Sequence, residues 1–136
     1  MNVEEVFLLS VEEWNNIVSS VPNIPVELDN FWWLRSPGHT DYCAAYVGGI
    51  GYVDFFGRRV DLEFGVRPAF RISHLSGFKP GDKITVSTKT VCTVICNDTA
   101  LADSIVCKHR FDPKSNNYNN SEIKAYINFD EFKNML

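Results

Sequence analysis

The sequence predicts a small α+β domain in which short strands form mixed or antiparallel sheets and short helices lie at the N- and C-terminal ends. Two observations carry this prediction. The middle of the chain contains many short apolar or β-branched runs separated by glycine and proline turns, which is typical of strands. Helix-start signals and helical apolar spacing occur near the two ends. With 136 residues, the chain fits a single domain over 1–136.

The N-terminal segment predicts a strand followed by a helix. Residues 4–9 form a short apolar run. Ser10 and Glu13 then have the spacing of a capping box, in which each side chain accepts a hydrogen bond from the backbone of the other residue. Apolar residues at helical spacing follow, so we expect a helix from 11 to about 19, ended by the prolines beyond it.

The rest of the chain predicts short strands and two further helices. An apolar block at 31–34 stops at a turn signal over 36–38. Strands are expected at 42–47, 52–56, 60–64, 66–72, 83–86 and 90–96, with turns at 48–51 and 57–59 and a connector at 73–81. Pro68 implies that the strand 66–72 is an edge strand or contains a bulge. Residues 100–111 fit either a strand or a short helix, 112–120 a surface loop, and 121–127 and 129–136 two helices.

Charge and composition exclude several function classes. The net charge of −4 argues against non-specific nucleic-acid binding, which needs a basic face. No apolar run is long enough to span a bilayer, and the N-terminus is acidic where a signal peptide would be basic. We therefore expect a cytoplasmic protein without membrane contact, whose four cysteines are reduced.

Two segments resemble a family signature. Residues 31–38 (FWWLRSPG) and 65–70 (GVRPAF) resemble the paired WWLRSPG and GVRPA motifs of an uncharacterised bacterial and phage domain family. Residues 7–13 are similar to the FLLS-xEE segment of that family, and residues 111–124 are similar to another of its elements. The resemblance covers most of the chain.

The resemblance implies a C-type-lectin-like core, in which a Trp-rich strand and a Gly-x-Arg strand pack below a variable, displayed segment. Residues 39–64 would then be the display segment. Residues 1–75 would form the lectin-like part, and 76–136 would add a hairpin and the C-terminal helices packed on it. The resemblance also implies a phage or other mobile element as the source of the chain. A shared fold does not by itself establish a function.

The display segment supplies the candidate binding residues. They are Tyr42, Tyr46, Tyr52, Asp54, Phe55, Arg58 and Arg59. Tyrosine and arginine are frequent at binding hot spots because they combine a large contact area with polar groups. Strand alternation would place Tyr52, Asp54 and Phe56 on one face, with Val53 and Phe55 on the other. The alternative interpretation is an ordinary sheet with one core face and one solvated face.

For four other conspicuous side chains, the sequence favours structural roles. Trp32 and Trp33 lie on opposite strand faces, so core packing is favoured over a stacking platform for a sugar. Arg35 and Arg67 would sooner bond loop carbonyls or a carboxylate than clamp an anion.

Metal and nucleophile candidates are weak. Cys92, Cys96, Cys107 and His109 match a zinc pattern only loosely, so no metal or other cofactor is expected. His39 and Cys43 form a short-range pair, but no recognised nucleophile motif surrounds them.

Together these features favour a non-enzymatic protein-binding domain that occupies a surface of a bacterial host protein, for example a defence nuclease. The alternatives are a carbohydrate-binding or ligand-binding lectin-like module, or an enzyme built on the same scaffold around Cys43 and His39.

Overall fold

The computed structural model describes residues 2–27 and 30–136. Within these residues, ten strands form two five-stranded sheets, accompanied by three α-helices and one 3-10 helix. The elements in chain order are β1 (Val3–Phe7), α1 (Val11–Ser20), β2 (Trp32–Pro37), β3 (Cys43–Val47), β4 (Val53–Arg59), β5 (Glu63–Val66), β6 (Ala69–Ile72), β7 (Lys83–Val86), β8 (Thr90–Cys96), β9 (Thr99–Ala102), β10 (Cys107–Arg110), η1 (Tyr118–Asn120), α2 (Glu122–Ile127) and α3 (Asp130–Lys133).

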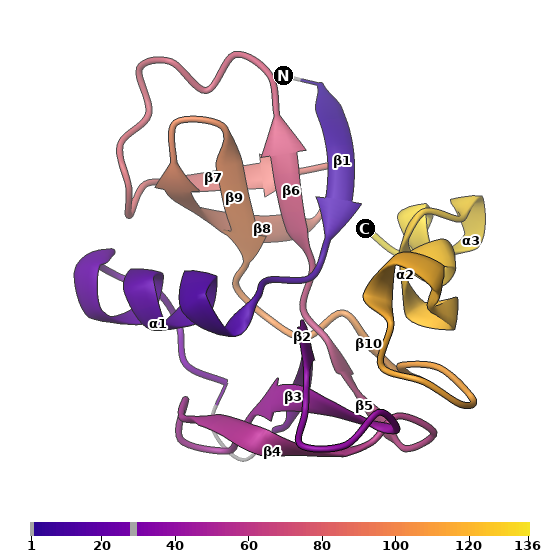
Figure 1. Cartoon of the computed structure of the whole chain (residues 1–136). Coiled ribbons are helices and arrows are strands. Elements are labelled where there is room, and N and C mark those ends of the chain that lie inside the picture. The colour runs from indigo at the N-terminus through magenta and orange to yellow at the C-terminus, as the bar shows by residue number, and fades with distance from the viewer. Residues whose placement is uncertain (1, 28–29) are drawn as a thin grey trace.

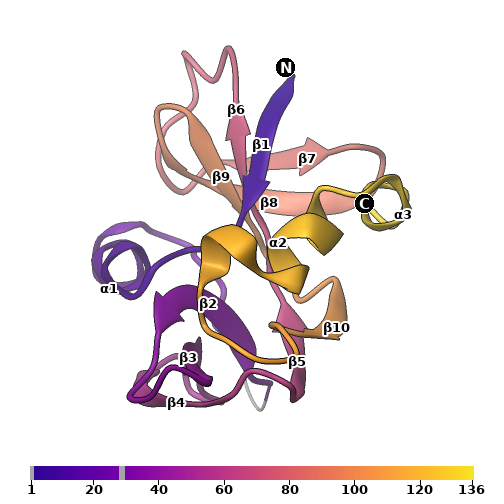
Figure 2. The ribbon, with the colours of Figure 1, turned by 45° about the vertical axis from the view of Figure 1, so that its right-hand side comes forward.

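The first sheet has the strand order β1-β6-β9-β8-β7 and the second sheet has the order β10-β5-β2-β3-β4. Figure 1 shows the first sheet above the second, with α1 on one side and the C-terminal helices on the other. The turned view in Figure 2 keeps the same separation. The predicted α+β class is confirmed. Each sheet combines strands from 1–75 with strands from 76–136, so the two parts of the chain interleave.

The capping box and the helix that it begins are confirmed. The Oγ of Ser10 accepts the Glu13 N–H at 3.1 Å, and Oε1 of Glu13 accepts the Ser10 N–H at 2.8 Å. These bonds satisfy backbone donors that a helix start leaves without partners. The helix buries Val11, Trp14 and Ile17 along one face, which fixes it beside the two sheets.

Both predicted core tryptophans are fully buried on opposite faces of β2. Trp32 packs edge-on against Trp14, with ring centroids 5.0 Å apart. Trp33 stacks on Phe64 at 4.6 Å in a separate apolar cluster. The second sheet therefore contributes to apolar packing on both of its faces at β2. Neither ring offers a platform for a ligand, because both have no exposed surface.

The predicted single strand over 66–72 is wrong. β5 ends at Val66 in the second sheet, whereas β6 begins at Ala69 in the first sheet. Arg67 and Pro68 form the crossing between the sheets. β6 lies between β1 and β9, so the proline marks a break between strands and not a sheet edge. Both halves of this run are buried, so the whole run is apolar and its sequence predicts one strand, although the halves belong to different sheets.

Three further expectations are corrected or resolved. The turn predicted at 57–59 is wrong, since β4 continues to Arg59. The predicted strand 60–64 begins only at Glu63, after a turn. The ambiguous segment 100–111 contains the end of β9 and all of β10, and no helix. The predicted hairpin of β7 and β8 and the two terminal helices are confirmed.

Candidate functional site

Exposed aromatic side chains gather on the hairpin of β3 and β4. Among the described residues, six of the eleven exposed large apolar side chains fall within 31–56. Four of them, Phe31, Tyr52, Phe55 and Phe56, line one shallow depression together with Tyr46, Gly48, Val53 and Asp54. We call this depression the aromatic hollow. β4 is an edge strand of the second sheet, and it lies at the lower margin of the molecule in Figure 1, away from the C-terminal helices.

The predicted site residues divide into exposed and buried ones. Tyr52 is 73% exposed, Phe55 62% and Tyr42 51%. Arg58 and Arg59 are also exposed. Tyr46, by contrast, is only 4% exposed, and Asp54 is half-buried. The hollow thus brings together Tyr46, Tyr52, Asp54 and Phe55, whereas Tyr42 does not line it.

A bulge of three residues against one in β4 explains why two neighbouring phenylalanines line the same hollow. Tyr46 pairs with Asp54 and Ala44 with Arg58, so residues 55–57 of β4 stand opposite Ala45 alone. The predicted alternation of faces therefore fails beyond Asp54. Bulges are known to redirect side chains at sheet edges. Here the bulge leaves Phe56 69% exposed beside Phe55. Phe56 is not among the binding residues that the sequence predicts.

Backbone contacts hold the bulge in place. Gly57 has a φ of 79°, and a Cβ at this position would lie 2.3 Å from the Ala44 carbonyl oxygen. Only glycine adopts such a conformation without strain. The Gly57 N–H donates to Oδ1 of Asp54 at 3.1 Å, and the Phe56 carbonyl accepts the His39 N–H at 2.8 Å. The exposed rings therefore project from a fixed backbone.

A tyrosine–aspartate pair forms the floor of the hollow. The Tyr46 hydroxyl donates to Oδ2 of Asp54 at 2.9 Å. Burial and the hydrogen bond to the Asp54 carboxylate raise the pKa of Tyr46, against a smaller opposing effect of Arg58. Each carboxylate oxygen of Asp54 already accepts a hydrogen bond from within the chain. Asp54 therefore supports the hairpin more than it offers a free acceptor.

Two anchors connect the hairpin to the rest of the fold. The indole N–H of Trp14 donates to the Gly51 carbonyl at 2.9 Å, in the turn between β3 and β4. The Nδ2 of Asn116 donates to the carbonyls of Thr40 and Cys43, at 2.9 and 3.0 Å. The predicted surface loop over 112–120 thus holds the segment before β3 in place through Asn116. The loop also contains the short helix η1.

Arg35 and Arg67 have the structural roles that the sequence favoured. Arg67 is fully buried against the rings of Trp14 and Trp32, with its guanidinium carbon 5.3 and 5.0 Å from their centroids. Its Nε and Nη2 donate to the carbonyls of Ala102 and Pro25. Burial lowers the pKa of Arg67 to about 10. The group therefore stays charged at neutral pH.

Arg35 joins the start of α1 to β2. Its Nη1 donates to the Leu8 carbonyl at 2.7 Å and to Oε1 of Glu13 at 2.5 Å. Burial alone would raise the pKa of Glu13, but the bonds from Arg35 and Ser10 outweigh it and hold that pKa below its usual value.

The weak metal candidates are divided between the two sheets. Cys92 is buried in the first sheet, while Cys107 and His109 lie on β10 of the second. Within the part of the chain that the structure describes, no three potential ligands come together around a metal position. Burial raises the pKa of Cys92 to about 12 and also raises that of Cys107. A raised pKa is the opposite of what a nucleophilic thiol needs. The His39 ring packs 5.4 Å from Phe56, at the margin of the β4 hairpin.

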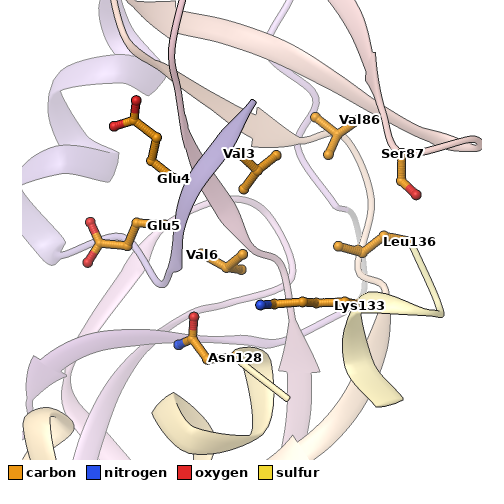
Figure 3. A pocket seen from close by; sticks show the side chains of 9 residues that line it. All are labelled: Val3, Glu4, Glu5, Val6, Val86, Ser87, Asn128, Lys133 and Leu136. Atoms are coloured by element: carbon orange, nitrogen blue, oxygen red, sulfur yellow. The ribbon is translucent and has the colours of Figure 1, made fainter. Parts of the chain in front are cut away.

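A second depression lies between the free edges of the first sheet. It is lined by residues of β1, the end of β7 and the C-terminal helices, and it encloses about 260 Å³. Figure 3 shows Glu4 and Glu5 extending to the other side of β1 from Val86 and Leu136. The carboxylates therefore do not converge with Lys133. Four of the nine lining residues are apolar, and five are polar or charged: Glu4, Glu5, Ser87, Asn128 and Lys133.

Comparison with known proteins finds no match: no family model, no curated protein and no solved structure is similar to this chain. Within 2–27 and 30–136, no helix has the length and apolar character needed to cross a bilayer.

Proposed function

We propose that this chain is a non-enzymatic protein-binding domain whose contact surface is the aromatic hollow and its arginine-bearing margin. The observation that carries the proposal is the gathering of Phe31, Tyr52, Phe55 and Phe56 around one depression on an edge hairpin. Monomeric proteins rarely expose contiguous apolar patches without a use for them.

The geometry favours recognition by side chains over addition of a partner strand. A regular edge strand can pair with an extended peptide through its backbone. The bulge at 55–57 interrupts the backbone of β4 and turns aromatic rings outward instead. Large rings held on a fixed backbone lose little conformational entropy on binding, which suits them as anchors.

The partner that fits the charge is a protein with a basic surface. The net charge of −4 would steer the chain toward such a surface, and burial of the rings would then hold the complex. A bacterial host protein such as a defence nuclease, occupied by a cytoplasmic phage-encoded or mobile-element-encoded protein, is the example that we propose. Arg58 would add a polar contact at the margin.

We also propose that the second sheet is a C-type-lectin-like core. The parallel pairing of Trp32 with Gly65 supports this, since the Trp-rich and Gly-x-Arg strands lie side by side as expected of that core. A carbohydrate ligand is the second candidate, favoured by the exposed rings next to Asp54. The internal bonds to both Asp54 oxygens weigh against it, because sugars need free polar acceptors.

The test starts with affinity capture from bacterial lysate, using the wild-type chain and the variants Tyr52→Ala, Phe55→Ala and Arg58→Ala. Phe129→Ala is the matched control, because Phe129 is 66% exposed but lies at the start of α3. The captured protein is then purified and titrated. We expect hot-spot substitutions to weaken binding by about 30-fold and raised salt to weaken it further.

Binding that Phe129→Ala weakens as much as Phe55→Ala does would refute the proposed surface. The absence of any partner that binds after purification would refute the protein-binding function. A glycan array that gives binding sensitive to Tyr52→Ala would replace the protein partner with a carbohydrate.

A further inference from the structure

We propose that a second copy of this chain packs on the aromatic hollow, forming a weak dimer about a two-fold axis. The inference goes beyond the proposed function and does not depend on it, although both use the same surface. If both hold, a partner protein and a second copy compete for the hollow.

The surface carries both halves of a self-complementary contact. A two-fold interface uses the same patch on each subunit, so a projecting group and the recess that receives it must both lie within that patch. The aromatic hollow provides a recess of about 470 Å³. Phe55 and Phe56 line it and are 62% and 69% exposed, so they project at its margin. Rotation about an axis near the margin would insert a phenylalanine of each copy into the hollow of the other.

The exposed area suits a weak dimer. At about 200 Å² for each large ring, the exposed fractions of the four rings amount to about 500 Å² per copy. These rings would bury at most about 1,000 Å² in total, which is at the lower limit for specific association. We therefore expect a monomer in dilute solution and a dimer as the concentration rises.

Side-chain packing is favoured over pairing of the two β4 edges. A continuous ladder across two copies needs a regular edge, and the bulge at 55–57 breaks it. The local charges are balanced, because Arg58 and Arg59 lie close to Asp54 and Asp61. The long-range charges oppose association, since each copy carries −4.

The effect of salt concentration on association therefore distinguishes the dimer from the complex with a basic partner. Screening reduces the repulsion between two acidic bodies, so the dimer becomes stronger as salt is raised. Binding to a basic partner instead becomes weaker under the same change. The two proposals thus predict opposite responses of the same surface.

The experiment is sedimentation velocity of the purified chain over a concentration series at low and high salt. Wild type, Phe55→Ser and Phe56→Ser are compared with the control Phe129→Ser, which also removes an exposed ring. We expect the mass of the wild type and of the control to approach that of a dimer, more readily in high salt. Both hollow variants should stay monomeric, with unchanged circular dichroism as evidence of an intact fold.

A wild type that stays monomeric at the highest concentration in both salts overturns the inference and leaves the partner-binding proposal standing. A dimer that Phe55→Ser and Phe56→Ser leave intact overturns it as well, because the interface then lies elsewhere. Growth beyond the dimer overturns the two-fold arrangement, since a closed contact stops at two copies.

Discussion

Replacing Arg67 with methionine tests whether the buried guanidinium stabilises the crossing between the two sheets. Methionine keeps an unbranched apolar stem against the rings of Trp14 and Trp32 but removes both hydrogen bonds. The carbonyls of Ala102 and Pro25, now bonded at 2.7 and 2.9 Å, would lose their donors. The substitution therefore separates the polar contribution of Arg67 from its packing contribution.

The expected loss of stability is the balance of two opposing effects. Each hydrogen bond from a charged donor contributes about 1.5–3 kcal/mol, and a buried carbonyl without a donor costs a similar amount. Removing the buried charge offsets part of this loss of stability, because burial disfavours the charged form of Arg67. We expect a net loss of about 3 kcal/mol in the free energy of unfolding. The free energy of unfolding of Arg67→Lys should lie between those of the wild type and Arg67→Met, because one ammonium group cannot reproduce the two donors of the guanidinium.

Urea unfolding followed by tryptophan fluorescence measures this loss directly, because two of the rings touch Arg67. The matched control is Arg71→Met. Arg71 also lies over an aromatic ring, that of Phe7, but 43% of its side chain is exposed. That control should lose no more than about 1 kcal/mol. An Arg67→Met protein within about 0.5 kcal/mol of wild type would refute the reasoning, because its carbonyls would then have found other donors.

Three further substitutions address the hairpin and its anchors. Asn116→Ala should cost about 1–2 kcal/mol and speed amide hydrogen exchange over 39–43, because two loop carbonyls lose their donor. Gly57→Ala should cost about 2 kcal/mol or more in thermal or urea unfolding, since its φ is positive and its Cβ would meet a carbonyl oxygen. The folded pKa of Glu13 is lowered, so its stabilisation is present above the usual glutamate pKa and is lost as pH falls through the folded value. Urea titrations across acidic pH should show a shallower acid loss for Glu13→Gln.

Local signals in the sequence are sufficient to predict much of the scaffold. The capping box at Ser10 and Glu13 gives the start of α1 because the bonds form within one turn. Alternation along β2 gives opposite faces for Trp32 and Trp33 because that strand is regular at this point. Structural roles for Arg35 and Arg67 follow from the tendency of a buried arginine to hydrogen-bond loop carbonyls or to pair with a carboxylate.

The sequence was not sufficient where neighbours in space decide the outcome. The run through Val66 and Ala69 has one apolar character, and only the assembled sheets show that it divides at Arg67. The bulge of β4 depends on a close approach of Gly57 to Ala44 on the facing strand. One signal was available: glycine followed by two arginines was interpreted as a turn, but glycine inside a strand also marks a bulge. That alternative would have placed Phe56 beside Phe55.

Apart from Phe31, which belongs to both, the motif segments and the aromatic hollow have different physical roles. The Arg35 N–H donates to the Leu9 carbonyl, and the Ser36 Oγ accepts the Val11 N–H, so residues 31–38 hold the start of α1 against β2. The contacts that depend on residue identity are those of the Ser36 Oγ and of the Arg35 guanidinium, because substitution at either position removes them. Tyr52, Phe55 and Phe56 lie outside both signature segments and contribute exposed rings that no core contact requires. Substitutions at these three positions should therefore change binding while leaving the fold intact, whereas substitutions in the signature should lower stability first and binding only as a consequence.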